Sequence, residues 1–482
     1  MAERQRQSRF DGGEQVVVMK FGGTSVEDAA AIRRVIGIVQ GRPGAQVAVV
    51  VSALARVTDQ LLEAGRDAAS GRLGSALATV RNIYVRHEKL ADELVGESAY
   101  GSLDRELRGE FRALESLLIE LDSSRCLDAR AQDQLLGFGE CFASRLVQES
   151  LREAGVQAVH VDARKCIVTD ARHGQAAPVW AETNLRIQEI VGPVLASGRV
   201  AVLGGFIAAT EDEVPTTLGR GGSDFSAAIV AAALFASRVE IWTDVDGVMT
   251  TDPKLCPDAR VIRKMSFDEA AELASSGAKV LHPATIVPAM RENIPVYVLN
   301  SRKPEGEGTE ITSRPRSGKA VSAIAAKRKV ASIEVEAPSG INADFLSAVY
   351  AVLDRHSCVV DLMETSPSRI SLLVSSSPEL PTIAGDLQKI APVHWENHKA
   401  LVSLIGENIR RQPEIASRAL GAVSDIDLRV LGQGASERSI AFLVEEAKVE
   451  ESVQRLHGLF FPYSDGTRDW GAVSVAFCQA GQ

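Results

Sequence analysis

The stretch Gln15–Ser25 reads QVVVMKFGGTS and carries the strongest indication of the fold. Its first five residues have the pattern of a buried strand, and a Gly-Gly turn then leads into a Ser/Thr cap for a helix over Val26–Val39. A strand, a glycine turn and a helix start in this order point backbone N–H groups at an anion, with the helix dipole behind them. Lys20 at the end of the strand can place an ammonium on the same anion. A plain strand–turn–helix junction with Ser25 as N-cap is the alternative explanation.

Further apolar runs alternate with helical patterns along the next part of the chain. Short strands are expected over 46–52, 159–161, 200–204 and 239–243, and a largely helical block over 61–155. Strands separated by helices predict an α/β fold with a mostly parallel sheet sandwiched by helices. No G-x-x-x-x-G-K-[ST] run and no H-R-D and D-F-G pair occur, so neither a Walker-A NTPase nor a protein-kinase fold is expected.

The composition excludes several functional classes. Lys+Arg 53 against Asp+Glu 63 gives the 482 residues a net charge of −10, which argues against a surface built for nucleic acid or anionic lipid. The longest nearly apolar stretch, Phe225–Ala236, is too short to cross a bilayer, and the N-terminus lacks the apolar core of a secretory signal. Six cysteines without a C-x-x-C pair indicate neither a zinc site nor a disulfide framework. We therefore expect a cytoplasmic protein with no resident metal.

A second glycine-rich turn, TTLGRGGSD, occupies residues 216–224 ahead of a helix of small residues. Three glycines surround Arg220, whose guanidinium can bind a carboxylate or phosphate in a fork. Asp224 can pair with a lysine, whereas Ser223 or Asp224 can equally well cap the helix. A functional anion site and a flexible turn explain this motif about equally well from the residues alone.

Three more segments place polar residues where strands meet helices. WTDVDGVMTTDPK at 242–254 offers Asp and Thr oxygens for a ribose or a magnesium–phosphate group, although acidic turn chemistry also explains it. Lys279 in SSGAKVLHP can reach a phosphate, while His282 fits a structural role. Glu140 ends the run LLGFGE as a lone carboxylate, for which an exposed or capping role is the default. Four Gly- or Thr-rich anion sites in one α/β unit are what phosphoryl transfer requires.

The composition of the sequence changes after Asn300. Residues 301–319 are rich in Gly, Pro, Ser and charge and mark a domain boundary. Beyond them, two segments that start roughly 70 residues apart, at 330 and 400, share a β-α-β-β rhythm. We interpret them as a degenerate duplication of a small ferredoxin-like α+β module, with two unrelated modules as the alternative. The expected organisation is a disordered tail at 1–13, a catalytic domain at 14–312, a linker at 313–329 and modules at 330–396 and 397–475.

Six motifs in a fixed order carry a family resemblance: KFGGTSV, Ser52-Ala53 with Thr58, LLGFGE, TTLGRGGSD, WTDVDGVMTTDP and SSGAKVLHP. This order resembles the aspartokinase signature within the amino-acid-kinase fold, over about residues 16–311, and the paired modules resemble ACT domains. The helical block between Thr58 and Glu140 is similar to that of the long, lysine-sensitive type. A homoserine dehydrogenase half is not expected, because no G-x-G-x-x-G follows a strand before the chain ends.

The resemblance implies transfer of the ATP γ-phosphoryl to the β-carboxylate of L-aspartate, with Mg²⁺ held mainly by the phosphates. Lys20, Asp224 and Arg220 would be catalytic. Aspartate would be bound by Thr58, Glu140, Arg220 and Ser223, with Glu140 taking the ammonium. ATP would be bound by Lys20, Gly22, Gly23, Thr243, Asp244, Asp252, Lys254 and Lys279. Met249 and Lys254 stand where the family usually has Tyr and often Arg, which weakens two contacts to ATP.

The C-terminal modules imply feedback regulation. Asp361 in VVDLMETS resembles the effector-holding strand of the first ACT module, with Thr365 and Ser366 nearby. Asp344 and Pro367 replace a glycine and a glutamate of the lysine-sensitive type, so lysine, threonine or no effector remain open. The second module's QGASE at 433–437 resembles the dimer-side pattern, which implies a homodimer or a dimer of dimers.

Two other functions fit the sequence less well. Another amino-acid kinase, acting on acetylglutamate or glutamate, would lack the pairing of Glu140 with TTLGRGGSD and the twin ACT modules. A catalytically silent amino-acid sensor would have no reason to keep Lys20, Arg220 and Asp224. A carboxylate acceptor is already ionised at neutral pH, so the reaction needs no general base and no motif histidine.

Overall fold

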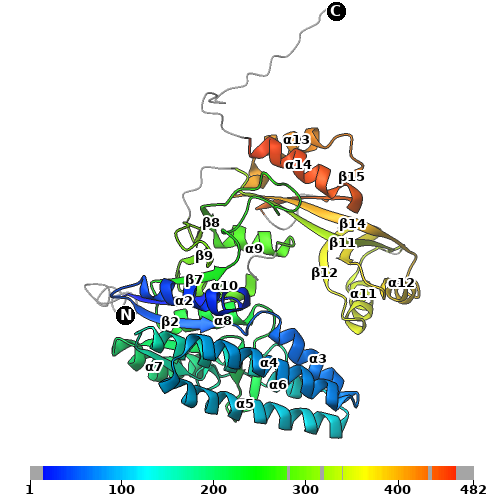
Figure 1. The fold of residues 1–482 in the computed structure, drawn as a ribbon. Coiled ribbons are helices and arrows are strands. Elements are labelled where there is room, and N and C mark those ends of the chain that lie inside the picture. The colour runs from blue at the N-terminus through cyan, green and yellow to red at the C-terminus, as the bar shows by residue number, and fades with distance from the viewer. Residues whose placement is uncertain (1–14, 279–282, 315–319, 339, 432–436, 463–482) are drawn as a thin grey trace, which may run out of the picture. The chain divides into compact units, whose positions relative to one another are not determined.

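The computed structural model describes residues 15–278, 283–314, 320–338, 340–431 and 437–462 (Figure 1). The chain divides into two compact units. The first comprises the residues up to Thr250 together with Arg260–Ser322, and the second comprises Thr251–Ala259 together with the residues from Ala323 onward. The expected tail at 1–13, Lys279, His282 and residues 433–436 lie outside the described residues.

The first unit is built on an eight-stranded sheet of order β3-β4-β2-β1-β7-β9-β10-β8. Its strands are β1 (Val16–Phe21), β2 (Gln46–Val51), β3 (Ala158–Val161), β4 (Val200–Gly204), β7 (Arg238–Thr243), β8 (Lys264–Ser266), β9 (Val296–Asn300) and β10 (Thr309–Thr312). The run from β3 to β9 is parallel throughout, and only β10 against β9 is antiparallel. The predicted mostly parallel sheet is confirmed. A separate hairpin of β5 (Ile207–Ala209) and β6 (Pro215–Thr217) was not expected from the sequence.

Side chains of β1 are buried on both faces of this sheet. Val17, Met19 and Phe21 belong to a large hydrophobic cluster together with residues of the surrounding helices. Val18 is also fully buried. Because successive side chains of a strand point to opposite faces, Lys20 lies on the face opposite that cluster, where α8 (Gly222–Ala233) packs against β1.

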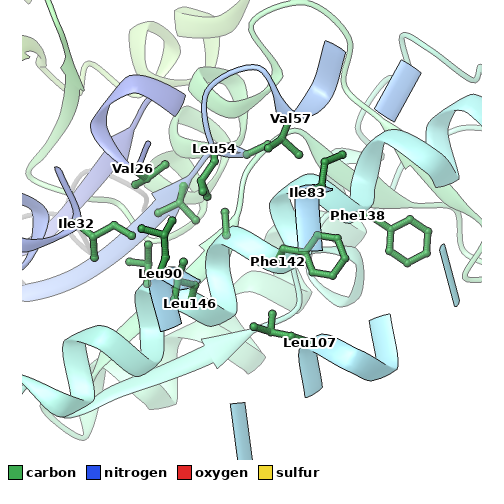
Figure 2. Close-up of a cluster of buried hydrophobic side chains, with 14 of the residues drawn as sticks. Val26, Ile32, Leu54, Val57, Ile83, Leu90, Leu107, Phe138, Phe142 and Leu146 are labelled. Atoms are coloured by element: carbon green, nitrogen blue, oxygen red, sulfur yellow. The ribbon is translucent and has the colours of Figure 1, made fainter. Parts of the chain in front are cut away.

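The helices of the first unit include a long bundle that confirms the predicted helical block. Its members, which pack on one another, are α3 (Val57–Ala69), α4 (Leu73–Leu94), α5 (Glu97–Ser124) and α6 (Ala129–Glu153). Figure 2 shows part of their shared core, to which Ile83, Leu107, Phe138 and Phe142 all belong. The remaining helices are α2 (Ala29–Gln40), α7 (Trp180–Ala196), α8, α9 (Phe267–Ser275) and α10 (Pro283–Arg291).

The second unit contains an antiparallel six-stranded sheet of order β12-β13-β11-β14-β16-β15, and its described residues form four α-helices. Its strands are β11 (Ala323–Glu336), β12 (Val360–Ser366), β13 (Arg369–Ser375), β14 (Val393–Ile405), β15 (Leu428–Leu431) and β16 (Ser439–Glu445). Its helices are α11 (Ala343–Arg355), α12 (Leu380–Leu387), α13 (Pro413–Ala422) and α14 (Val449–Phe460), of which α11 packs on α12 and α13 on α14.

Strand β11 begins at Ala323, inside the stretch expected to be a linker. Residues Ala323–Lys327 pair with Leu401–Ile405 of β14, and the later residues pair with both β13 and the first half of β14. The register shifts between Lys327 and Val330, and Lys329 has a φ of 56°. The charged run KRK at this bulge interrupts the apolar pattern from which a strand is predicted, so the start of β11 was not predicted from the sequence.

Candidate active site

The carboxyl ends of four parallel strands meet at one edge of the first unit's sheet. Strands β1, β2, β4 and β7 end at Phe21, Val51, Gly204 and Thr243. Because β2 lies on one side of β1 and β7 on the other, β1 marks the point at which the strand order reverses. Ligands of open α/β sheets bind in the crevice at such a point.

The glycine turn after β1 lies against β7. The N–H of Gly22 donates to the carbonyl of Trp242 at 3.1 Å, and Ser25 Oγ donates to the same carbonyl at 3.3 Å. Ser25 Oγ also lies 2.8 Å from Ser301 Oγ, just past β9. These contacts hold the KFGG turn at the reversal point of the sheet.

Gly23 allows the turns after β1 and β2 to approach closely. A Cβ at this position would lie 2.8 Å from the carbonyl oxygen of Ala53. The Gly23 carbonyl in turn accepts the N–H of Ala55 at 3.1 Å. At Gly22 a Cβ would lie 3.6 Å from Lys20 Nζ, so the ammonium lies near this turn. The backbone of the glycine turn and the Lys20 ammonium therefore lie next to each other.

Lys20 and Asp224 form an ion pair between the two glycine-rich motifs. Lys20 Nζ lies 2.7 Å from Asp224 Oδ1, and their side chains are 12% and 16% exposed. Lys20 reaches α8 because of its position on β1, and Asp224 stands in the first turn of α8. A carboxylate near a helix N-terminus is stabilised by the helix dipole, and from this position Asp224 orients the Lys20 ammonium. The predicted pairing of Asp224 with a lysine is confirmed.

Glu140 is a buried carboxylate on α6 rather than the exposed or capping residue that was the default expectation. It is 3% exposed, and its Oε2 has no hydrogen-bond partner among the described residues. Burial raises the pKa of the Glu140 carboxyl to about 8, against the opposing effects of the Ala53 N–H, its own N–H and the charge of Lys20. A Cβ at Gly204 would lie 3.1 Å from Glu140 Cβ, so α6 packs directly on the end of β4.

The turn after β4 contributes residues that were not predicted from the sequence. A Cβ at Gly205 would lie 2.7 Å from Ser223 Cβ, which brings this turn against the start of α8. Phe206 has a φ of 66°, a left-handed conformation that is uncommon for a bulky residue. Its N–H donates to Ser226 Oγ at 2.9 Å, and its carbonyl accepts the N–H of Leu218 at 2.9 Å. The Gly-Gly pair directly after a strand was the available signal.

Arg220 lies at the exposed end of the TTLGRGGSD loop. Within the described part of the chain it makes no hydrogen bond or ion pair, so its guanidinium is available to an anion. Gly221, with a φ of 72°, is the N-cap of α8, and Ser223 follows in the first turn. Arg220 therefore lies directly before the helical turn that carries Ser223 and Asp224.

Thr58 lies half-buried in the first turn of α3, after the close approach of Ala53 to Gly23. A Cβ at Gly139, the neighbour of Glu140, would lie 2.7 Å from Ala53 Cβ. The start of α3 and the buried carboxylate of α6 are thus joined through Ala53.

Thr243 and Asp244 stand at the end of β7, beside the KFGG turn. Thr243 Oγ1 donates to Asp244 Oδ1 at 3.3 Å, and the Thr243 carbonyl accepts the N–H of Ser301 at 2.8 Å. Asp252 and Lys254 instead belong to the second unit, where Asp252 Oδ1 accepts the N–H of Lys254 at 2.9 Å.

The proposed effector residues lie on β12 of the second unit. Asp361 is ion-paired with Lys327 Nζ of β11. Thr365 and Ser366 are exposed, and Ser366 Oγ donates to the Arg369 carbonyl at 3.3 Å. The Asp361 carboxylate therefore already has an ammonium partner within the chain.

The arrangement at the sheet edge suits the handling of small anions. It combines an oriented ammonium, an available guanidinium, glycine turns and one buried carboxyl with an unpartnered oxygen. Within the described residues no three His, Cys, Asp or Glu side chains converge to hold a metal ion. No described helix is long and apolar enough to cross a membrane.

The class of protein follows from family models. The amino acid kinase family model matches residues 15–300, more than half of the chain, and an ACT domain model matches residues 402–460. The chain therefore belongs to the amino acid kinase family and carries an ACT region.

Individual relatives define the branch of this family. Lysine-sensitive aspartokinase 3 of Escherichia coli K12 is 34% identical over 93% of this chain and 99% of its own length. The chloroplastic aspartokinase 3 of Arabidopsis thaliana is 33% identical over 92% of this chain and 81% of its own. The crystal structure of E. coli aspartokinase III with aspartate and ADP matches with a TM-score of 0.81 at 33% identity, over 93% of this chain and 100% of that one. The form with lysine and aspartate gives 0.78 at 34% identity, over 92% and 99%. The chain is a member of the aspartokinases, ATP-dependent kinases of aspartate with an allosteric ACT region.

Proposed function

We propose that this chain transfers the γ-phosphoryl group of ATP to the β-carboxylate of L-aspartate and so starts the synthesis of lysine, threonine and methionine. The observation that carries this proposal is the Lys20–Asp224 ion pair, which joins the two glycine-rich turns. A fixed ammonium at that point neutralises charge on the transferring phosphoryl group. Such electrostatic positioning is the main requirement of phosphoryl transfer.

Glu140 and Arg220 suit the two ends of aspartate. The unpartnered Oε2 of Glu140 is an acceptor for the substrate ammonium, and the unpaired guanidinium of Arg220 can bind a carboxylate in a fork. The hydroxyls of Thr58 and Ser223 complete the proposed aspartate site. Arg220 also helps to neutralise the two reacting anions as they approach.

The proposed ATP site lies on the β1 and β7 side of the edge. The backbone of Gly22 and Gly23 approaches the phosphates together with Lys20, and Thr243 and Asp244 contact the nucleotide. The proposed roles of Asp252, Lys254 and Lys279 in this site rest on their motifs alone. Mg²⁺ would be carried mainly by the phosphates, whose charge it partly neutralises.

The chemistry needs no base from the protein. A carboxylate with a reference pKa of ~3.9 is ionised at neutral pH, so the acceptor is already a nucleophile. The residues of the site therefore act by holding two anions in line and by reducing their repulsion. One extra methylene changes binding by only ~1–3 kcal/mol through packing, so steric exclusion must help to reject glutamate.

The deciding experiment measures ADP release by the purified full chain with ATP and Mg²⁺ in a coupled assay. We expect turnover with L-aspartate that exceeds turnover with L-glutamate by at least about tenfold, the scale of one methylene. ADP release that is equal with and without aspartate would overturn the proposal. Turnover with glutamate or acetylglutamate alone would indicate another amino-acid kinase.

The ACT region is proposed to bind lysine or threonine through Asp361, Thr365 and Ser366 and to form a homodimer or a dimer of dimers. The E. coli relative is lysine-sensitive by name, and its structure with lysine is among those that match. Titration of activity with each amino acid tests the effector, and light scattering of the purified chain tests the assembly.

A further inference from the structure

A second carboxylate of α6, Asp133, is buried without a role in the proposed chemistry. Asp133 is 2% exposed and lies two helical turns before Glu140, on the same side of the helix. Helix α6 packs against β6 along this part of its length. A buried carboxylate is costly unless hydrogen bonds satisfy it, so its partners indicate what it holds in place.

Asp133 binds two segments of the chain that are separate in the sequence. Its Oδ2 lies 2.8 Å from His173 Nδ1 and accepts the N–H of Gly174 at 3.0 Å. Its Oδ1 accepts the hydroxyl of Thr217 and lies 3.1 Å from the nitrogen of Gly174. One side chain thus clamps the loop before α7 to the end of β6.

The clamped residues lead directly into the Arg220 loop. Thr217 ends β6, and its carbonyl accepts the N–H of Ala176 at 3.0 Å. A Cβ at Gly219 would lie 2.9 Å from Gln175 Cγ and 3.0 Å from the Gly174 carbonyl oxygen, so the two loops are in tight contact. Arg220 directly follows Gly219, and it has no partner of its own among the described residues.

We propose that Asp133 is a positioning residue for Arg220: by clamping Gly174 and Thr217, it fixes the loop that presents the guanidinium to a carboxylate of the substrate. The inference rests on the proposed function, in which Arg220 binds aspartate. Asp133 touches no reactant, so its loss should act on aspartate binding through Arg220. Hydrogen bonds to charged groups are the strong ones, and a displacement of about 1 Å can cost 10²-fold in a bound geometry.

The test compares Asp133→Asn and Thr217→Val with the wild type in the full chain. Asp133→Asn keeps the shape and removes the charge, and Thr217→Val removes a single donor. We expect Asp133→Asn to raise the KM for aspartate at least about tenfold and to lower kcat as well, because Arg220 also neutralises the reacting anions, while the KM for ATP stays unchanged. Thr217→Val should shift the aspartate KM in the same direction by about threefold.

Two further measurements separate positioning from a general loss of structure. Asp162→Asn removes another partly buried carboxylate of this unit, which pairs with Arg164 at 2.8 Å, and should leave the aspartate KM unchanged. In an Arg220→Ala background, Asp133→Asn should have no additional effect on the aspartate KM.

Each result decides the proposal. Full additivity of Asp133→Asn with Arg220→Ala, or an aspartate KM that stays at the wild-type value, would overturn it, as would an equal loss in the Asp162→Asn control. If Asp133→Asn does not fold, Thr217→Val alone decides by the same criteria. A wild-type chain without aspartate-dependent turnover would instead refute the proposed function.

Discussion

Lys20 Nζ lies 2.7 Å from Asp224 Oδ1, and this one contact joins the first strand of the sheet to the first turn of α8. The alternation of β1 places Lys20 on the face that α8 covers, and the left-handed Gly221 starts the helix at the right point. The ammonium is therefore held in position before any ligand arrives. Preorganisation of this kind is what makes a charged group effective in catalysis.

Removal of the ammonium should abolish most turnover. We expect Lys20→Ala to lower kcat by at least ~10²-fold, the scale for the loss of one preorganised donor. Lys20→Arg keeps the charge but not the compact geometry and should remain well below the wild type. The coupled ADP-release assay measures both variants. Near-normal kcat in a folded Lys20→Ala protein would refute the assigned role.

Aspartate binding should release a proton near neutral pH. Burial raises the pKa of Glu140 to about 8, so the unliganded carboxyl is largely protonated at pH 7. An arriving ammonium favours the ionised form, so the proton leaves and aspartate affinity rises as the pH rises toward 8. Calorimetric titrations at pH 7 in buffers of different ionisation enthalpy measure the release directly.

The Glu140→Gln variant supplies the control for this proton. It should bind aspartate more weakly, and its binding heat should no longer depend on the buffer in this way.

The Glu140 carboxyl should also make the stability of the folded chain depend on pH. Because folding raises the pKa of Glu140 from 4.5 to about 8, the free energy of unfolding of the unliganded wild type should fall as the pH rises from about 4.5 to 8. In Glu140→Gln it should fall less.

A methyl group at Gly23 should separate the two turns. The new Cβ would lie 2.8 Å from the Ala53 carbonyl oxygen, which is backbone and cannot rotate away. We expect Gly23→Ala to lower kcat/KM for ATP by about 10²-fold through displacement of the turn. Gly37→Ala is the matched control, because a Cβ at Gly37 on α2 meets nothing within 4 Å. It should leave activity unchanged and raise the free energy of unfolding by about 0.5–1 kcal/mol.

The sequence predicted the parallel sheet and its glycine turns because apolar runs and Gly pairs are local signals. A lysine partner for Asp224 was one of two roles that its motif allowed, and the contact with Lys20 decides between them. The burial of Glu140 was not predictable, because it depends on the packing of Ala53 and Gly204, both distant in the chain, against α6.

Other features could not be predicted from the sequence, because they depend on short segments or on contacts between distant residues. The hairpin β5–β6 has strands of three residues, which is too short for a periodic pattern. Phe206 has a positive φ, and its backbone is held by hydrogen bonds to Ser226 and Leu218, neither of which is adjacent to it in the sequence. Asp133 is one of many charged residues in a helical block, so its role was not predicted. Its contact with Thr217 depends on the fold, because the two residues are far apart in the sequence.

Acid should destabilise the first unit through a buried histidine. His87 is fully buried on α4, with Nδ1 2.8 Å from the Ile83 carbonyl and Nε2 without a partner among the described residues. Burial lowers the pKa of His87 to about 4. The unfolded chain protonates this group near pH 6.5, so stability is lost as the pH falls from 6.5 toward 4.

The His87→Phe variant measures this contribution by urea unfolding at several pH values. Its free energy of unfolding should fall less steeply than that of the wild type below pH 6.5. The dependence should not vanish, because burial also lowers the pKa of His160 to about 4. Parallel pH profiles for the two proteins would contradict the buried neutral state of His87.

An effector amino group must compete with Lys327 if it binds at Asp361. The two side chains are ion-paired in the chain, and removing Lys327 frees the carboxylate. We expect Lys327→Met to lower the concentration of effector for half-inhibition by about threefold, the scale of a weak ion pair, and Asp361→Asn to abolish inhibition. Arg328→Met is the matched control, since its partner is Glu450 at 2.7 Å and not Asp361. Titrations of activity with lysine and with threonine distinguish the two effectors. Rates that no concentration of either amino acid changes, in the wild type and in Lys327→Met, would remove both from the regulation of this enzyme.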